Sequence, residues 1–207
     1  MRISYAFLGL GAALLLTTSV AAAPYEAGTV LLRLRALNVV PDFGSSVSLG
    51  SAYHVTGTNQ TVPEVDVTYF FDPNWSVEVI AGTTKHSLYL NNTVYIGSAW
   101  ILPPTVTLQY HFDLGRVQPY LGAGLNYSLF YGKDTVAGLG KLKLTDQWGG
   151  ALQAGADFPL GADGKAFFNI DVKKIFVSTH ASYTAAPVTA NVDVNPWLIG
   201  AGIGYRF

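Results

Sequence analysis

The stretch Gln118–Tyr131, with the sequence QPYLGAGLNYSLFY, carries the pattern that decides the fold of this chain. Its odd-numbered positions after Pro119 are leucine, alanine, leucine, tyrosine, leucine and tyrosine, while its even-numbered positions are mostly glycine, asparagine, serine and glutamine. Successive side chains of a β-strand point to opposite faces, so this alternation predicts a strand with one apolar face and one polar face. Its fourteen residues suffice to cross a bilayer, which takes roughly 9–11 residues of a tilted strand.

Seven further stretches alternate in the same way, and the connections between strands alternate in length. The seven stretches are Thr29–Val39, Val62–Phe71, Trp75–Thr84, Pro104–Phe112, Asp146–Pro159, Ala166–Val177 and Val194–Phe207. The short connections are residues 72–74, 113–116 and 160–164, and the long ones are residues 40–61, 85–103, 132–145 and 178–193. Short turns at one end and long loops at the other are typical of outer-membrane barrels. The predicted fold is therefore all-β: an eight-stranded antiparallel transmembrane β-barrel of the outer membrane, with both termini in the periplasm.

The composition supports a membrane location and excludes several other classes of protein. Only 12% of the 207 residues are charged, whereas about 25% is typical of soluble domains. The formal net charge of -1 offers no basic surface for nucleic acid, and the absence of cysteine excludes disulfides and thiolate metal sites.

The N-terminus has the pattern of a secretory signal peptide. Arg2 precedes an apolar run from Ala6 to Leu16, and small residues follow up to Ala23. Eleven apolar residues suit a signal peptide, since a spanning helix needs about 20. We expect a signal peptide over residues 1–22, with cleavage after Ala22 or Ala21, and a barrel domain over residues 23–207. The alternative is an N-terminal membrane anchor.

The residue content of the two strand faces indicates which one meets lipid. One face is aliphatic in the middle of the strands and aromatic toward their ends, as expected for a lipid-facing surface with aromatic girdles. The opposite face carries the charged residues, namely Arg33, Arg35, Lys173, Arg206, Glu64, Asp66, Glu78, Asp157 and Asp171. A soluble barrel with the faces exchanged would have too few surface charges. We expect Glu78, Asp157, Asp171 and Arg206 to pair and to plug the periplasmic half of the lumen, a structural role rather than a gating one.

The last four residues are Gly204, Tyr205, Arg206 and Phe207. A terminal aromatic residue preceded by alternating apolar residues resembles the C-terminal signature of bacterial outer-membrane barrels. The resemblance implies that Tyr205 and Phe207 form a signal that the barrel-assembly machinery recognises.

Six stretches, in order over the mature chain, resemble the OmpW family, which includes the AlkL-type alkane-uptake proteins. They are Leu102-Pro103-Pro104-Thr105, Gln109-Tyr110-His111-Phe112, the nine residues from Pro119 to Tyr127, the six from Lys143 to Trp148, Asn195-Pro196-Trp197, and Gly204-Tyr205-Arg206-Phe207. The resemblance implies an eight-stranded outer-membrane barrel with a hydrophobic channel that binds or passes small hydrophobic molecules. It also implies an apolar constriction at Ile80, whose partner position here is Lys173, where some relatives carry tryptophan.

Apolar residues are frequent in two of the long loops. We expect these loops to form a mouth for an apolar solute, with two inward-facing apolar side chains below it. The candidates are Trp100, Ile101, Leu102, Leu142 and Leu144 for the mouth and Ile80 and Phe130 below it. The alternative is that the loop residues are strand extensions that pack on lipid or on each other.

Pro103 and Pro104 remove two adjacent backbone donors at the start of one strand, so a weak seam is expected there. The hypothesis is that a small hydrophobic solute enters the mouth, meets the plugged lower lumen and leaves sideways through this seam into the lipid. The alternative function is a non-conducting structural barrel whose loops contact host surfaces, phages or bacteriocins.

Catalysis is not expected. Of His54, His86, His111 and His180, only His111 falls on an inward position of a predicted strand, and no glycine-flanked nucleophile motif is present. No spacing typical of a metal site occurs, so neither a metal nor another cofactor is expected. The expected partners are outer-membrane lipid, a small hydrophobic solute and the assembly machinery, and the expected state is a monomer.

Overall fold

The computed structural model describes residues 25–161 and 163–207 and contains fifteen strands there. No helix in these residues is long and apolar enough to span a membrane. The strands are β1 (Val30–Val40), β2 (Gly44–Val47), β3 (Val55–Gly57), β4 (Gln60–Phe70), β5 (Trp75–Ala81), β6 (Thr84–Leu90), β7 (Val94–Leu102), β8 (Thr105–His111), β9 (Gln118–Thr135), β10 (Leu142–Leu144), β11 (Gln147–Leu160), β12 (Ala166–Phe176), β13 (Ser178–Tyr183), β14 (Thr189–Asp193) and β15 (Trp197–Arg206).

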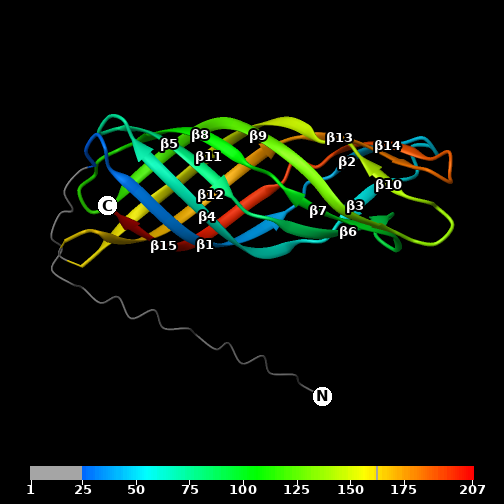
Figure 1. Ribbon diagram of the computed structural model, residues 1–207, viewed down its shortest axis with the longest axis horizontal. Helices are drawn as coiled ribbons and strands as arrows, with labels where there is room; N and C mark the ends of the chain where they lie inside the picture. The colour runs from blue at the N-terminus through cyan, green and yellow to red at the C-terminus, as the bar shows by residue number, and fades with distance from the viewer. Residues whose placement is uncertain (1–24, 162) are drawn as a thin grey trace, which may run out of the picture.

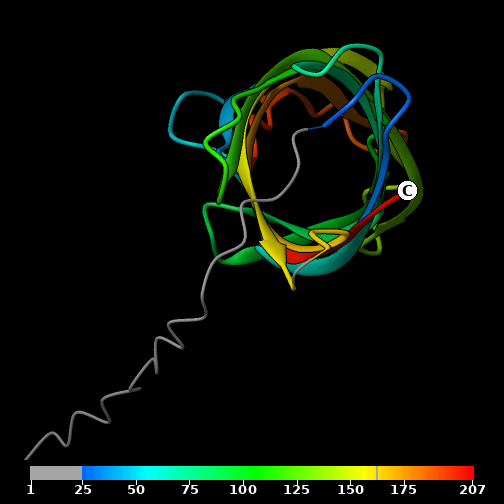
Figure 2. The same ribbon diagram turned by 90° about the vertical axis from the view of Figure 1, so that its left-hand side faces the viewer.

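Eight of these strands form a closed antiparallel barrel. Their order around the ring is β1, β4, β5, β8, β9, β11, β12 and β15, and β15 pairs with β1. Figure 2 shows the ring end-on, from the end at which the C-terminus lies. The predicted fold is confirmed. Closure leaves no barrel strand with an unpaired edge in lipid.

The long connections are not loops throughout, which corrects the predicted boundaries. Most of β6, and all of β2, β3, β7, β10, β13 and β14, lie within segments predicted as loops. They extend the barrel beyond the membrane-spanning ring, toward the right in Figure 1. The physical reason is that period-2 alternation continues past the ring, as in Val188–Val194, where four apolar residues alternate with polar ones.

The two faces of the ring are divided as the sequence predicts. Apolar side chains such as Val79 and Leu125 point outward and are 52% and 63% exposed. The charged side chains of Arg33, Glu78 and Asp157 point inward and are fully buried. A ring with this polarity is stable when its outer surface meets hydrocarbon rather than water.

Aromatic side chains form a belt at each end of the apolar outer surface. At the end with the short turns, Trp75 packs on Tyr110 with ring centroids 5.0 Å apart, and Tyr205 packs on Phe207 at 4.9 Å. At the opposite end, Trp148 packs on Tyr127 at 4.8 Å. Such belts lie at the membrane interfaces, so they mark the limits of the membrane-spanning part.

The end of the lumen near the short turns is closed by an apolar cluster. Tyr25, Leu31, Phe70 and Phe167 are each at least 95% buried there. The Tyr25 hydroxyl donates a hydrogen bond to Asp157 Oδ2 at 2.9 Å. The predicted signal peptide, residues 1–22, and residue 23, at which the barrel domain is expected to begin, lie outside the described residues.

Gly202 on β15 lies where the backbone of β1 comes very close. A Cβ atom at Gly202 would lie 2.0 Å from the carbonyl oxygen of Leu34 and 2.6 Å from Cα of Arg35.

Because both of these neighbours of Gly202 are backbone atoms, we predict that Gly202→Ala lowers the free energy of unfolding by about 1–3 kcal/mol. Urea unfolding in detergent micelles measures it. Gly150→Ala is the control, since a Cβ atom there meets nothing within 4 Å. Equal unfolding midpoints for the two variants would contradict the prediction.

Candidate functional site

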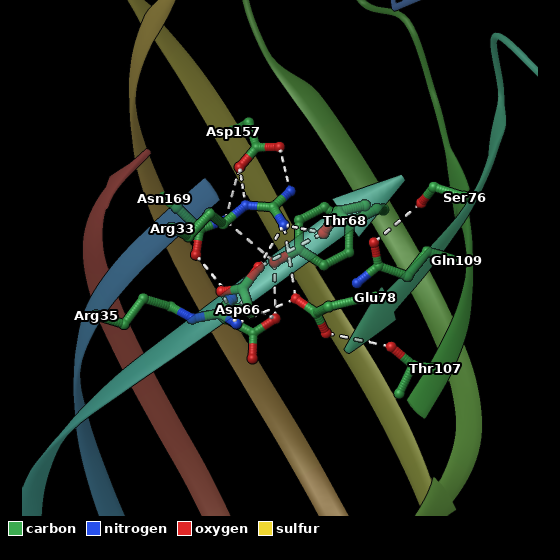
Figure 3. Close-up of polar contacts among 12 residues, drawn as sticks. Arg33, Arg35, Asp66, Thr68, Ser76, Glu78, Thr107, Gln109, Asp157 and Asn169 are labelled. Atoms are coloured by element: carbon green, nitrogen blue, oxygen red, sulfur yellow. Dashed lines mark hydrogen bonds and ion pairs between the residues drawn. The ribbon is translucent and has the colours of Figure 1, made fainter. Parts of the chain in front are cut away.

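Arg33 lies at the centre of a polar network that fills the lower half of the lumen. Its side chain, from β1, pairs with Asp157 of β11 at 2.8 Å and with Asp66 of β4 at 3.0 Å, as Figure 3 shows. It also donates a hydrogen bond to Thr68 Oγ1 at 2.6 Å. The guanidinium therefore joins opposite walls of the barrel.

Arg35, two residues further along β1, makes a second set of contacts one level higher. Its Nε donates to Glu64 Oε1 at 2.8 Å, its Nη2 to Glu78 Oε1 at 3.1 Å, and its Nη1 to Asn169 Oδ1 at 3.1 Å. Both arginines are at most 1% exposed. Planar guanidinium groups, with five donors each, suit the cross-linking of several carboxylates in a narrow space.

Lys173 of β12 lies at the top of this network. Its Nζ pairs with Asp171 Oδ1 at 2.5 Å and with Glu64 Oε1 at 3.3 Å. Lys173 is the partner position of Ile80 in the constriction that the family resemblance implies, and here it is a paired charge. It lies at the upper limit of the polar part of the lumen.

Neutral side chains satisfy the remaining carboxylate oxygens. Gln153 Nε2 lies 2.9 Å from Glu78 Oε2 and 2.7 Å from Asp171 Oδ2, and Tyr120 donates to the same Asp171 oxygen at 2.7 Å. We call the buried set Arg33, Arg35, Glu64, Asp66, Glu78, Asp157, Asp171 and Lys173, with these neutral partners, the plug.

Of the four residues predicted to plug the lumen, Glu78, Asp157 and Asp171 lie in this network. Arg206 is half-buried near the end of β15, opposite Leu31 and beside the apolar cluster that closes the lower end. Buried charges are costly unless they are paired and hydrogen-bonded, so the mutual contacts of these side chains stabilise the filled lower lumen.

An apolar cavity of about 390 Å³ lies above the plug, enclosed by the strand extensions. A smaller chamber of about 60 Å³ lies between this cavity and the plug, with Glu64 and Lys173 in its wall. The two spaces share the lining residues Pro41, His86, Ile101, Phe130 and Val194. We refer to the two together as the cavity. It has the size of pockets that hold small ligands.

The structure brings most of the predicted mouth residues together in this lining. Ile80, Ile101, Phe130, Leu142 and Leu144 all line the cavity.

Trp100 and Leu102 differ from the expectation, because they lie outside the lining. Trp100 is exposed on the outer surface and stacks on Tyr131 at 6.1 Å, and Leu102 pairs with Leu129. The reason is that residues 94–102 form the strand β7 rather than a loop, so the neighbours of inward-facing Ile101 point outward.

Two other segments also contribute to the lining, which was not expected from the sequence. Phe43, Val47 and Val55 come from residues 40–61, and Ala190 and Val192 come from β14. The alternation of apolar and polar residues over 188–194 is a signal that could have identified the second group.

His86 is also placed differently from the expectation, because it lies on β6 with its ring facing the cavity. Its Nδ1 lies 2.6 Å from the carbonyl oxygen of Thr58, which can only accept, so Nδ1 carries the proton. On the outer surface next to it, Lys85 and Asp134 form an exposed ion pair, so this level lies above the membrane-spanning part. Burial lowers the pKa of His86, against the opposing effect of the hydrogen bond to Thr58, so the ring is neutral at neutral pH.

The two prolines lie where the barrel wall is interrupted. β5 and β8 pair up to Ile80 and Thr105, and β6 and β7 pair again from Thr84 and Ile101 onward. Between these pairs, residues 81–83 and 102–104 form no ladder pairs with each other, although Ala81 pairs with Val65 and Leu102 with Leu129 on their other edges. We call this interruption the seam.

On the opposite edge, toward β9, the carbonyl groups of both prolines are bonded. Pro104 accepts a hydrogen bond from Tyr127 N at 3.0 Å, and Pro103 accepts one from Asn126 Nδ2 at 3.2 Å. The interruption is therefore confined to the edge that faces β5 and β6.

Comparison with known proteins identifies the family. The sequence model described as "OmpW family" matches residues 26–207. The chain belongs to the OmpW family. Its relatives include "Uncharacterized outer-membrane protein y4mB" of Sinorhizobium fredii, which is 40% identical over 98% of this chain and 93% of the relative. Another is "Dibenzothiophene metabolism operon protein PahQ" of Pseudomonas aeruginosa, 32% identical over 69% of each chain.

The fold is similar to that of a solved family member. The crystal structure of the outer membrane protein OprG from Pseudomonas aeruginosa matches this chain with a TM-score of 0.82 and 30% sequence identity. The match covers 89% of this chain and 98% of the OprG chain. This OmpW-family chain is accordingly a β-barrel of the outer membrane.

The plug predicts unequal effects for two ion pairs of this OmpW-family barrel. Arg33→Met removes the cation paired with buried Asp157 and one of the two cations paired with buried Asp66, which lowers the free energy of unfolding by roughly 3–5 kcal/mol. Lys85→Met removes an exposed ion pair with Asp134 and costs only about 0–1 kcal/mol. Urea titrations of both variants test this. Similar losses of stability would show that the buried arginine is not essential to the fold.

Proposed function

We propose that this OmpW-family barrel binds small hydrophobic molecules in its cavity and passes them into the outer membrane by lateral release through the seam. The observation that carries the proposal is a pair of adjacent apolar spaces with shared lining residues, which lie above the polar plug and reach the seam.

Hydrophobic transfer supplies the driving force for entry. The cavity wall is built almost wholly from aliphatic and aromatic side chains contributed by all four long connections. An eight-carbon chain gains about 6 kcal/mol on leaving water, at roughly 0.8 kcal/mol per methylene group. No separate energy source is required for this step.

The plug makes onward passage through the lumen unfavourable. A solute moving downward from the cavity would have to separate Lys173 from Glu64 and Asp171, and then displace both arginines. Separation of buried ion pairs costs several kcal/mol for each charge left without its partner. An apolar solute offers no compensating hydrogen bonds, so the lipid is the favoured destination.

The seam offers a route from the cavity to lipid. Gly82, Thr83 and Pro103 line the lower chamber of the cavity. Thr83 is also exposed on the outside of the barrel. Its hydroxyl contacts the carbonyl oxygen of Ile101 at 3.1 Å and the hydroxyl of Tyr131 at 2.5 Å. Only side-chain hydrogen bonds, and no backbone ladder pairs, would have to open there.

One relative supports an apolar substrate class. PahQ is named for an operon of dibenzothiophene metabolism, and dibenzothiophene is an uncharged aromatic molecule. By its relation to PahQ, this chain is a candidate for handling molecules of similar polarity.

Uptake into liposomes tests the proposed function. We predict that the wild-type protein accelerates entry of octane into liposomes, and that Ala190→Phe, which fills part of the cavity, reduces the acceleration at least severalfold. Ala154→Phe, on the exposed outer face, is the matched control and retains it. No acceleration by the wild type for any of several apolar solutes would favour a structural barrel whose loops bind surfaces.

A disulfide across the seam tests the lateral step by itself. The chain has no cysteine, so the pair Thr83→Cys and Leu102→Cys introduces the only two thiols. We predict that oxidation abolishes uptake while binding of octane persists, and that a reductant restores uptake. The control pair Val79→Cys and Val106→Cys bridges residues already paired in the ladder and leaves uptake unchanged. Full uptake by a demonstrably cross-linked seam would exclude this exit.

A further inference from the structure

Nearly every buried polar side chain that lines the cavity has a hydrogen-bond partner within the protein. Glu64 and Lys173 pair with each other, Thr105 donates to the Pro103 carbonyl, and Ser128 donates to Asn126. In the upper part, Thr179 and Tyr183 donate to the carbonyl groups of Thr145 and Ile96. These groups have little capacity left for a ligand.

Two side chains on β6 are different. Thr84 is 6% exposed, and its hydroxyl oxygen has no hydrogen-bond partner among the residues that the structure describes. His86 is 4% exposed, and its only hydrogen bond to the described part of the chain uses Nδ1. Since the ring is neutral and Nδ1 carries the proton, Nε2 is a hydrogen-bond acceptor without a protein partner.

Thr84 and His86 lie on the same face of one strand, two residues apart. Their Cα atoms are therefore separated by about 7 Å along β6. Both line the lower chamber of the cavity, and His86 also lines the upper part. A polar group buried without a partner, as the Thr84 hydroxyl is, destabilises the protein, and a ligand that pairs with it recovers part of that cost.

We infer that the cavity selects apolar molecules that carry one neutral hydroxyl group, which binds at Thr84 and His86 while the hydrocarbon part fills the space above. A hydroxyl group is both donor and acceptor, so it complements the acceptor Nε2 of His86 and the donor hydroxyl of Thr84. A pure hydrocarbon leaves both groups unpaired. A carboxylate is disfavoured, because it cannot donate to Nε2 and would have to be desolvated in an apolar cavity.

This inference rests on the proposed function, since it names the class of molecule that the same cavity takes. It also explains why the two groups lie near the level at which the seam opens. A molecule whose hydroxyl binds at Thr84 and His86 is held beside Gly82 and Thr83, with its hydrocarbon part in the cavity above.

Titration of the barrel in lipid nanodiscs with 1-octanol and with octane tests the inference. The histidine ring nitrogens are observed by NMR, with His54, His111 and His180 as internal references. We expect 1-octanol to move the Nε2 signal of His86 and octane to leave it unchanged. We also expect roughly threefold to tenfold tighter binding of 1-octanol to the cavity, after correction for its partition into lipid, as one or two net hydrogen bonds allow.

Two variants separate recognition from folding. Thr84→Val keeps the shape of the side chain and removes its hydroxyl, and His86→Asn keeps a donor toward the Thr58 carbonyl and removes the Nε2 acceptor. Each variant should lower the affinity for 1-octanol toward that for octane and leave octane binding unchanged. Equal binding of both molecules with an unmoved His86 signal would overturn the inference and leave the proposed function intact. Binding of neither molecule would overturn both.

Discussion

The contacts of Arg33 and Arg35 with five carboxylates are the interaction on which the rest of the structure depends. An eight-stranded barrel encloses a space only wide enough for side chains or for one small ligand. In the lower half, these two arginines (Figure 3) and Lys173 contact carboxylates from four strands, and all of these side chains are buried. Because this half is closed, the open part of the lumen lies entirely above it.

The boundary between plug and cavity follows from the order of residues along single strands. On β1, inward Arg33 and Arg35 are followed by inward Leu37 and Val39, and on β12 inward Asp171 and Lys173 are followed by Ile175. Each strand thus changes from charged to apolar at the same level of the barrel. The seam lies at this level too, since Ile80 and Thr105 are the last ladder pair below it. The bottom of the apolar space and the weakest part of the wall therefore coincide.

The sequence predicted the barrel, its faces and much of the plug, because one constraint governs all three. A strand in a closed barrel has a fixed period of two, and hydrocarbon on one side makes the choice of face unambiguous. The interruption at Pro103 and Pro104 could also be predicted, since proline lacks a backbone N–H donor wherever it occurs. The signal peptide stays a prediction, because it lies outside the described residues.

The parts that the sequence did not predict depend on register and on tertiary contacts. Residues 85–103 were expected to be a loop, so the alternation within them was not used, and Trp100 and Leu102 were placed in the mouth while His86 was overlooked. In the strands that extend the barrel, apolar and polar residues alternate over only a few positions. Such a short pattern identifies a strand only when the strands that pair with it are known, as with β10, which has three residues. Residues 81–83 form the other side of the seam, opposite the prolines. They could be identified only from the pairing of β5 with β8 and of β6 with β7.

The most direct test of the divided lumen is a measurement of where an apolar solute lies inside the barrel. Intermolecular NOEs from octane to methyl groups, recorded in nanodiscs of deuterated lipid, report contacts in the cavity and in the plug at once. We expect NOEs to Ile80, Ile101 and Leu142, which line the cavity. We expect none to the inward methyl groups of Thr68 and Thr107, whose hydroxyl groups contact Arg33 and Glu78 of the plug. NOEs from octane to Thr68 or Thr107 would contradict it, because they would place the solute on a path through the lower lumen.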